Sequence, residues 1–191
     1  MFKKDYYLDA SKFVAQWEGF TKNATWDVNA YRLGYGSDTI TFDNGSYRTV
    51  KQGDSTTEWN ALKDLARRIP EFEEKIITYL AKYGISEREW NKLPKNTKVA
   101  LISFAYNYGN IVKSKIREAI KTGDVNEIAD AVINSTINDN INTKYYKGLR
   151  RRREAEAELI RNSKKENIVK LAIPFVLLGA LLYYFRDDLK L

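Results

Sequence analysis

The chain has 191 residues, enough for one well-buried domain with an appendage. It contains no Cys and no His, which excludes a disulfide framework, the usual zinc ligands, a His general base and a Cys nucleophile. Acid–base chemistry therefore depends on carboxylates, Lys or Tyr, and we expect neither a metal site nor a cofactor. The net charge of +7 predicts attraction to polyanions such as nucleic acid, anionic lipid or an anionic cell wall.

The first predicted helix covers residues 9–18, with an apolar stripe that ends at Trp17. Asp9 or Ser11 is expected to cap its start. A glycine follows directly and ends the helix, so we expect Glu18 in or beside its last turn.

Short β-type runs come next. Thr39–Phe42 and Tyr47–Val50 flank Asn44–Gly45, which is a strong hairpin turn signal. From Ser55 onward the pattern is helical, and a break is expected near Pro70. Further helices are predicted at residues 71–83, 86–92, 96–108, 112–121, 124–135 and 145–162. One small hairpin among many helices predicts an α+β fold that is predominantly α.

The C-terminal tail has an apolar composition. Residues 171–185 are fifteen uncharged positions, and the run extends to 168–185 if Lys170 reaches the membrane surface. A spanning helix needs at least about 17 residues, while a buried helix is the alternative. We therefore expect a globular domain over residues 1–162 and a single-pass membrane anchor over residues 163–191, inserted as a C-terminal transmembrane helix.

Two carboxylates stand out in the stretch FVAQWEGFTKNATWD, where Asp27 follows Glu18 by nine positions. Aromatic neighbours desolvate a carboxyl group and favour its protonated form. That form is what a glycosidase needs in order to protonate a leaving oxygen. The alternative is a solvent-facing Glu at a helix end, which is the commoner situation for this residue type.

Four blocks, in order along the chain, resemble the phage-type lysozyme family. They are EGF…WDVNAYRLGYG (18–36), NTKVALISFAYNYGN (96–110), IKTGDVNEIADAV (120–132) and YYKGLRRRREAEAEL (145–159). Together they extend over about residues 9–162. The resemblance implies a lysozyme-like fold with a small N-terminal β-hairpin. It also implies cleavage of the β-1,4 bond between N-acetylmuramic acid and N-acetylglucosamine in peptidoglycan.

The resemblance also implies roles for particular residues. Glu18 matches the family's general acid, and Asp27 matches the carboxylate that positions or activates water. The family's third catalytic residue, a Thr, is missing where it is expected, because Arg32 stands there and the preceding stretch is one residue short. The family's His after the Gly-x-Gly turn is Ser37 here. Asp38 is therefore an alternative second carboxylate.

Several other side chains offer an aromatic face, an amide, a guanidinium or a hydroxyl to a sugar. The candidate substrate-binding residues are Tyr31, Arg32, Tyr35, Ser37, Thr39, Tyr106 and Asn107. For each Tyr, a half-buried core position is the alternative.

The basic run Arg150–Arg153 suggests a nucleic-acid patch, but the acidic residues directly after it favour local ion pairs. We therefore expect no specific nucleic-acid partner. In the family pattern, Arg152 or Arg153 turns inward to support the active site.

The sequence thus predicts a glycoside hydrolase, a bacteriophage lysozyme that degrades peptidoglycan glycan strands during entry or release. Basic residues before the tail predict a cytoplasmic domain, which cannot reach the wall. A virion membrane is therefore the preferred location, with the host cell envelope as the other. Two alternatives remain: a lytic transglycosylase that uses Glu18 alone, and a non-catalytic, membrane-bound wall-binding protein on a lysozyme fold.

Overall fold

The computed structural model describes residues 5–108, 113–136 and 146–163. The helices in these ranges are α1 (Tyr7–Ala15), α2 (Glu58–Ala81), α3 (Glu87–Lys92), α4 (Lys95–Tyr108), α5 (Ser114–Thr122), α6 (Val125–Ile133), a 3₁₀ turn at Asn134–Thr136, and a helix over residues 146–163, called the closing helix below. The strands are β1 (Thr21–Asp27), β2 (Ala30–Gly34), β3 (Thr39–Thr41) and β4 (Tyr47–Thr49).

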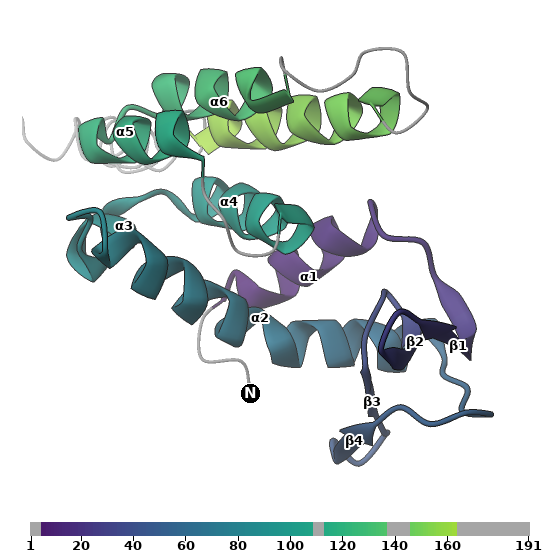
Figure 1. The fold of residues 1–191 in the computed structure, drawn as a ribbon. Helices are drawn as coiled ribbons and strands as arrows, with labels where there is room; N and C mark the ends of the chain where they lie inside the picture. The colour runs from purple at the N-terminus through teal and green to yellow at the C-terminus, as the bar shows by residue number, and fades with distance from the viewer. Residues whose placement is uncertain (1–4, 109–112, 137–145, 164–191) are drawn as a thin grey trace, which may run out of the picture.

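Helix α4 lies at the centre of the molecule (Figure 1). Helices α1 and α2 lie on one side of it, and α5, α6 and the closing helix lie on the other. Every residue from Thr97 to Ala105 is buried, as expected for a helix packed on all faces. The four strands lie beside the N-terminal half of α2 and form a small β lobe. These elements confirm an α+β fold that is predominantly α.

The predicted helix break at Pro70 was wrong, because α2 runs without interruption from Glu58 to Ala81. Its start is capped by Thr57, whose side chain accepts a hydrogen bond from the Asn60 N–H. An internal proline costs about 3 kcal/mol. Fully buried Ile69 and Ile76 flank the proline, and burial of each stabilises the helix by roughly 1.5–3 kcal/mol. Packing therefore outweighs the local helix-breaking signal.

Helix α1 begins at Tyr7, so the expected Asp9 or Ser11 cap was wrong. Ser11 lies inside the helix and donates to the Leu8 carbonyl instead. The start of the helix is held by tertiary contacts: the Tyr6 and Tyr7 hydroxyls both donate to the buried carboxylate of Glu73 on α2. Two aromatic side chains thus fix the position of this helix, which leads directly to Glu18.

The predicted hairpin around Asn44–Gly45 is confirmed as the antiparallel pair β3–β4. A second antiparallel pair, β1–β2, was not predicted, so the expectation of a single hairpin was incomplete. Its turn is formed by Val28 and Asn29, which lack the Asn-Gly or Asp-Gly signal of tight hairpins. Val28 has a φ of 52°, a conformation that is costly for a β-branched residue.

Among residues 5–108, 113–136 and 146–163, no helix combines the length and the apolar composition needed to cross a bilayer. The predicted anchor at residues 168–185 lies outside the described residues, as does nearly all of the predicted second unit over residues 163–191.

Candidate active site

Glu18 lies just beyond the end of α1, as the sequence predicted. The backbone N–H groups of Trp17 and Glu18 both donate to the Val14 carbonyl, at 3.0 and 3.2 Å, which extends the helix as a tight turn. Gly19 follows and the chain then enters β1. The Glu18 side chain is 28% exposed, so its carboxylate is partly desolvated and remains accessible.

The partner of Glu18 comes from the far end of the described chain. Arg152, on the closing helix, donates from Nη1 to Glu18 Oε1 at 2.7 Å. Both Arg152 and its neighbour Arg153 are buried, so both turn inward, as the family pattern implied for one of them. An arginine buried beside a carboxylate fixes the position of that carboxylate, because a guanidinium donates along fixed directions.

Tyr35, Tyr106 and Asn107 lie around the same centre. The Tyr106 hydroxyl donates to the Tyr35 carbonyl at 2.9 Å, which ties the β lobe to α4. Arg153 Nη2 donates to Asn107 Oδ1 at 3.1 Å. Burial raises the pKa of Tyr106, and the negative charge of Glu18 acts in the same direction. The Tyr106 hydroxyl therefore stays protonated and holds the turn at Tyr35.

An open pocket of about 650 Å³ is lined by Trp17, which precedes Glu18 in the chain, and by Arg152, which forms the ion pair with Glu18. Its lining residues are Trp17, Asn107, Tyr108, Gly148, Leu149, Arg151 and Arg152. A pocket of this size, lined by aromatic and apolar surface with a few polar groups, is typical of a ligand site.

Asp27 lies at the tip of the β1–β2 hairpin. Its side chain is 57% exposed and forms an ion pair with Arg32, Oδ2 to Nε, at 3.0 Å. The Asn29 N–H donates to the Asp27 carbonyl across Val28, which makes a three-residue turn with positive φ. Such turns are rare and strained. Asp27 therefore lies on a strained hairpin tip, paired with Arg32.

Tyr31 lies on the same hairpin, where its ring meets the exposed ring of Trp26 edge to face at 5.1 Å. Asp38, the alternative second carboxylate, is 48% exposed and forms a longer ion pair of 3.6 Å with Arg68. Both candidate second carboxylates are therefore accessible to solvent, and each has an arginine partner.

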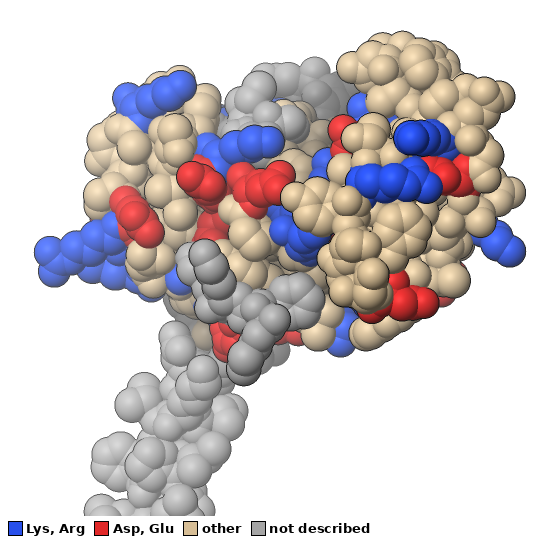
Figure 2. Space-filling view, turned by 90° about the horizontal axis from the view of Figure 1, so that it is seen from below, with Lys and Arg blue, Asp and Glu red and all other residues tan. Residues whose placement is uncertain are grey.

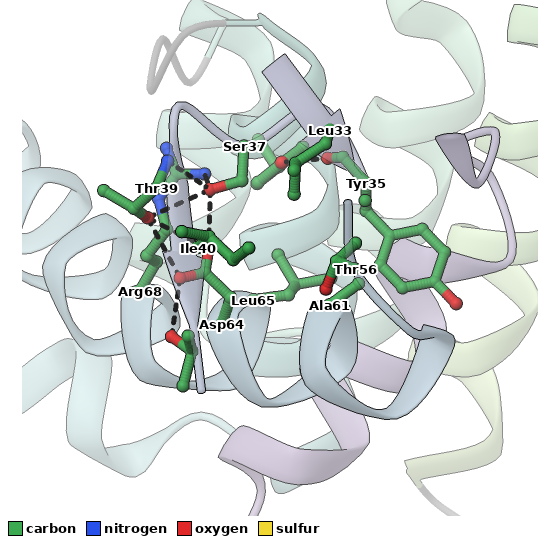
Figure 3. Close-up of a pocket in the computed structure, with 13 residues that line it drawn as sticks. Leu33, Tyr35, Ser37, Thr39, Ile40, Thr56, Ala61, Asp64, Leu65 and Arg68 are labelled. Atoms are coloured by element: carbon green, nitrogen blue, oxygen red, sulfur yellow. Dashed lines mark hydrogen bonds between the residues drawn. The ribbon is translucent and has the colours of Figure 1, made fainter. Parts of the chain in front are cut away.

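Ser37 and Thr39, which were predicted to contact substrate, take part in an internal cluster (Figure 3). Their hydroxyls donate to the carboxylate of Asp64 on α2, at 2.6 Å from Ser37 and 3.0 Å from Thr39. Thr41 adds a third hydroxyl at 2.7 Å. Ser37 is only 5% exposed, so its hydroxyl fixes the turn between β2 and β3.

Sequence reasoning missed Asp64. The sequence did contain a signal, because Asp64 falls among the apolar positions Ala61 and Leu65 of an amphipathic helix. In the structure this side of the helix faces the β lobe. Ion pairing to Arg67 at 3.0 Å balances its charge. This cluster shapes the β lobe, whereas Glu18, Arg152 and Tyr106 form the candidate reaction centre.

Charge on the surface is mixed. On the face seen in Figure 2, basic and acidic side chains are interspersed among uncharged ones. The net charge of +7 therefore does not form a single basic patch on that face.

The sequence model of one protein family, described as phage lysozyme, matches residues 15–156 of this chain. The matched range includes Glu18, Asp27 and the Arg152–Glu156 segment. A comparison with curated proteins found no significant match.

Proposed function

Because the chain belongs to the phage lysozyme family, whose members degrade peptidoglycan, we propose that it cleaves the β-1,4 bond between N-acetylmuramic acid and N-acetylglucosamine, with Glu18 as the general acid. The observation that carries this proposal is the geometry of Glu18. Its carboxylate is partly exposed and is held at 2.7 Å by a buried arginine that also lines an open pocket.

In this mechanism Glu18 protonates the glycosidic oxygen as the bond to the leaving sugar breaks. Positive charge then develops on the sugar ring, and a second carboxylate stabilises it or directs a water molecule to it. Asp27 is the first choice for that role, and Asp38 is the second. Tyr35, Tyr106 and Asn107 are proposed to contact the sugar chain near Glu18, and Tyr31 and Arg32 are proposed to contact it at the hairpin.

The decisive experiment compares the unaltered chain with Glu18→Gln in clearing a suspension of purified peptidoglycan. Gln keeps the size and the hydrogen-bond acceptor of Glu but cannot donate a proton as an acid. Clearing by the unaltered chain alone supports the enzyme. Binding without clearing by both proteins supports the alternative of a non-catalytic wall-binding protein.

A lytic transglycosylase is the second candidate, and one observation favours it. Arg32 stands where the family has a Thr, and it pairs with Asp27 at 3.0 Å. This pairing alters the place where Asp27 and the Thr are expected to hold the attacking water. In a transglycosylase the sugar's own hydroxyl attacks, so no such water is needed. Analysis of the products decides between the two, because a hydrolase leaves reducing ends and a transglycosylase leaves 1,6-anhydro ends.

The same product analysis on Arg32→Thr gives a sharper test. If Arg32 blocks the water site, the substitution frees Asp27, restores a hydroxyl and raises the share of reducing ends. Arg32→Lys, which keeps a positive charge, is the matched control and should leave the product ratio unchanged.

We also propose that residues 168–185 anchor the protein in a virion membrane, or in the host cell envelope, with the domain over residues 1–162 acting on the wall. The length and apolar composition of the segment support this. Recovery of the protein in the detergent-soluble fraction of purified virions is the expected result. Finding it in infected-cell lysates and never in virions contradicts the virion location.

A further inference from the structure

A buried polar cluster behind Arg152 has no role in the mechanism above. Glu156 lies one turn further along the closing helix and is fully buried. Its Oε1 accepts a hydrogen bond from Ser103 of α4 at 2.7 Å and lies 3.3 Å from Arg152 Nε. Its Oε2 lies 2.9 Å from Arg153 Nη1. A carboxylate without solvent contact is thus shared between two buried arginines and one hydroxyl.

Stability alone does not explain such a cluster. Burying each ion costs several kcal/mol, and apolar residues of the same volume are often as stable or more stable. The positions around it are apolar, for example Phe104, whose ring lies 4.4 Å from the Arg153 guanidinium carbon. A function for the charges is therefore the better explanation.

The contacts of Arg152 suggest that function. Its Nη2 donates to the Ser103 carbonyl at 3.1 Å and to the Ser103 hydroxyl at 3.2 Å. Its Nε faces the same hydroxyl and Glu156, each at 3.3 Å. One side of the guanidinium is therefore fixed to α4 and Glu156, and Nη1 on the other side points to Glu18. The contacts with Ser103 and Glu156 therefore fix the plane of the Arg152 guanidinium.

We propose that Glu156 is a positioning residue for the proposed cleavage reaction, acting on Glu18 through Arg152. It holds the guanidinium in the orientation that aligns Glu18, and its negative charge offsets part of the positive charge that Glu18 meets. This inference rests on the proposed function of Glu18 as a general acid.

The charge of Glu156 depends on pH in a useful range. Burial raises the pKa of Glu156 to about 7, although Arg153, Ser103 and Arg152 each act to lower it. The groups that face it come from its own helix (Arg152 and Arg153) and from α4 (Ser103), with Glu18 beyond Arg152. As pH rises through about 7, Glu156 becomes charged, and its ion pairs then hold the Arg152 guanidinium more firmly in the orientation that aligns Glu18.

The test measures kcat and KM of the full chain on soluble peptidoglycan fragments across pH 5–9, for the unaltered protein, Glu156→Gln and Glu154→Gln. Glu156→Gln retains the shape but never gains the charge. Its activity should match the unaltered protein at acidic pH. Above about pH 7, where Glu156 of the unaltered protein is charged, kcat of Glu156→Gln should be about threefold to tenfold lower than that of the unaltered protein. KM should stay unchanged.

Glu154→Gln is the matched control, because it removes a carboxylate two positions away that pairs with Arg150 in an exposed ion pair of 2.8 Å. Its pH profile should equal that of the unaltered protein. Ser103→Ala is the second variant and decides the question if Glu156→Gln does not fold. It loosens Arg152 while leaving every charge in place, so kcat should fall by about tenfold at all pH values.

The outcomes separate this inference from the proposed function. Absence of cleavage by the unaltered chain overturns both. The positioning role alone is overturned if the unaltered chain cleaves and kcat of Glu156→Gln equals that of the unaltered protein above about pH 7. If Glu156→Gln is unfolded, an unchanged kcat in Ser103→Ala overturns it.

Discussion

Substitution of Asp64 by Asn is the strongest test of how the β lobe is held to α2. Asp64 is 2% exposed and its carboxylate accepts hydrogen bonds from three hydroxyl groups of the β lobe. Arg67 Nη2 lies 3.0 Å away and balances the charge. Asn has the same shape but is uncharged, and its amide replaces one acceptor oxygen by a donor.

The expected loss of stability follows from these contacts. Breaking one partner of a buried ion pair costs about 3–5 kcal/mol, and a hydrogen bond to a charged group contributes about 1.5–3 kcal/mol. Hydroxyl groups can rotate to accept from the new amide, and Arg67 is partly exposed, so the lower end applies. We expect Asp64→Asn to lower the free energy of unfolding by about 3 kcal/mol. A domain stable by about 5–15 kcal/mol still folds after such a loss.

Urea unfolding followed by circular dichroism measures this change, with Asp43→Asn as the control. Asp43 is 89% exposed and lies 3.7 Å from Lys63, so its substitution should change stability by at most about 0.5 kcal/mol. A loss below about 1 kcal/mol in Asp64→Asn, with an unchanged urea slope, would refute the assignment of Asp64 as the main polar link between the lobe and α2.

Three further predictions concern stability. Val28→Gly should raise the free energy of unfolding by about 1 kcal/mol, because the left-handed conformation costs an L-residue about 1–2 kcal/mol and glycine little; a lower melting temperature would contradict this. The Arg48 guanidinium lowers the pKa of Asp54 to about 2, so Asp54 stabilises the fold above about pH 4 and this contribution is lost as pH falls through 2. Asp54→Asn should therefore flatten the dependence of the urea midpoint on pH between 4 and 2, and an unaltered slope would rule the linkage out. Tyr7→Phe removes one of the donors to buried Glu73 and should cost about 1–3 kcal/mol, and a neutral effect in urea unfolding would show that the carboxylate is satisfied without it.

Local signals predicted the elements whose ends are fixed by neighbouring residues. The β3–β4 turn at Asn44–Gly45 needs a glycine at positive φ, which the structure has at 84°. The start of α3 is fixed by Ser86 and Glu89, which form a reciprocal capping box. Both features lie within four residues of sequence, so a sequence pattern is enough to find them.

The missed features depend on residues far apart in the chain. The continuation of α2 through Pro70 depends on packing against α1 and α4, and local propensity does not report packing. The pairing of β1 with β2 uses a turn that lacks the usual residues, because Val28 replaces the expected glycine or asparagine.

The candidate site divides in the same way. The role of Glu18 was predicted from its neighbours in sequence and from the family resemblance, and it stays a prediction. Its contact with Arg152 joins positions 134 residues apart, and the link from Arg152 to Ser103 adds a third segment. No sequence periodicity connects positions so far apart, so only the family resemblance suggested an arginine that turns inward. Nothing in the sequence indicated that Glu156 contacts this arginine.

The two candidate carboxylates differ most in how firmly their arginines hold them. Arg152 is 5% exposed beside a Glu18 that is 28% exposed, whereas Arg32 is 30% exposed beside an Asp27 that is 57% exposed. An ion pair in the interior is screened less by water and salt than one at the surface. Glu18 is therefore fixed in orientation, as a proton donor to a defined oxygen must be. The exposed Asp27 carboxylate can replace its contact with Arg32 by a contact with water or substrate. This suits a group that interacts with the positive charge on the sugar ring only as that charge develops. In the proposed mechanism, this difference in burial favours Glu18 as the acid and Asp27 as the adjustable partner.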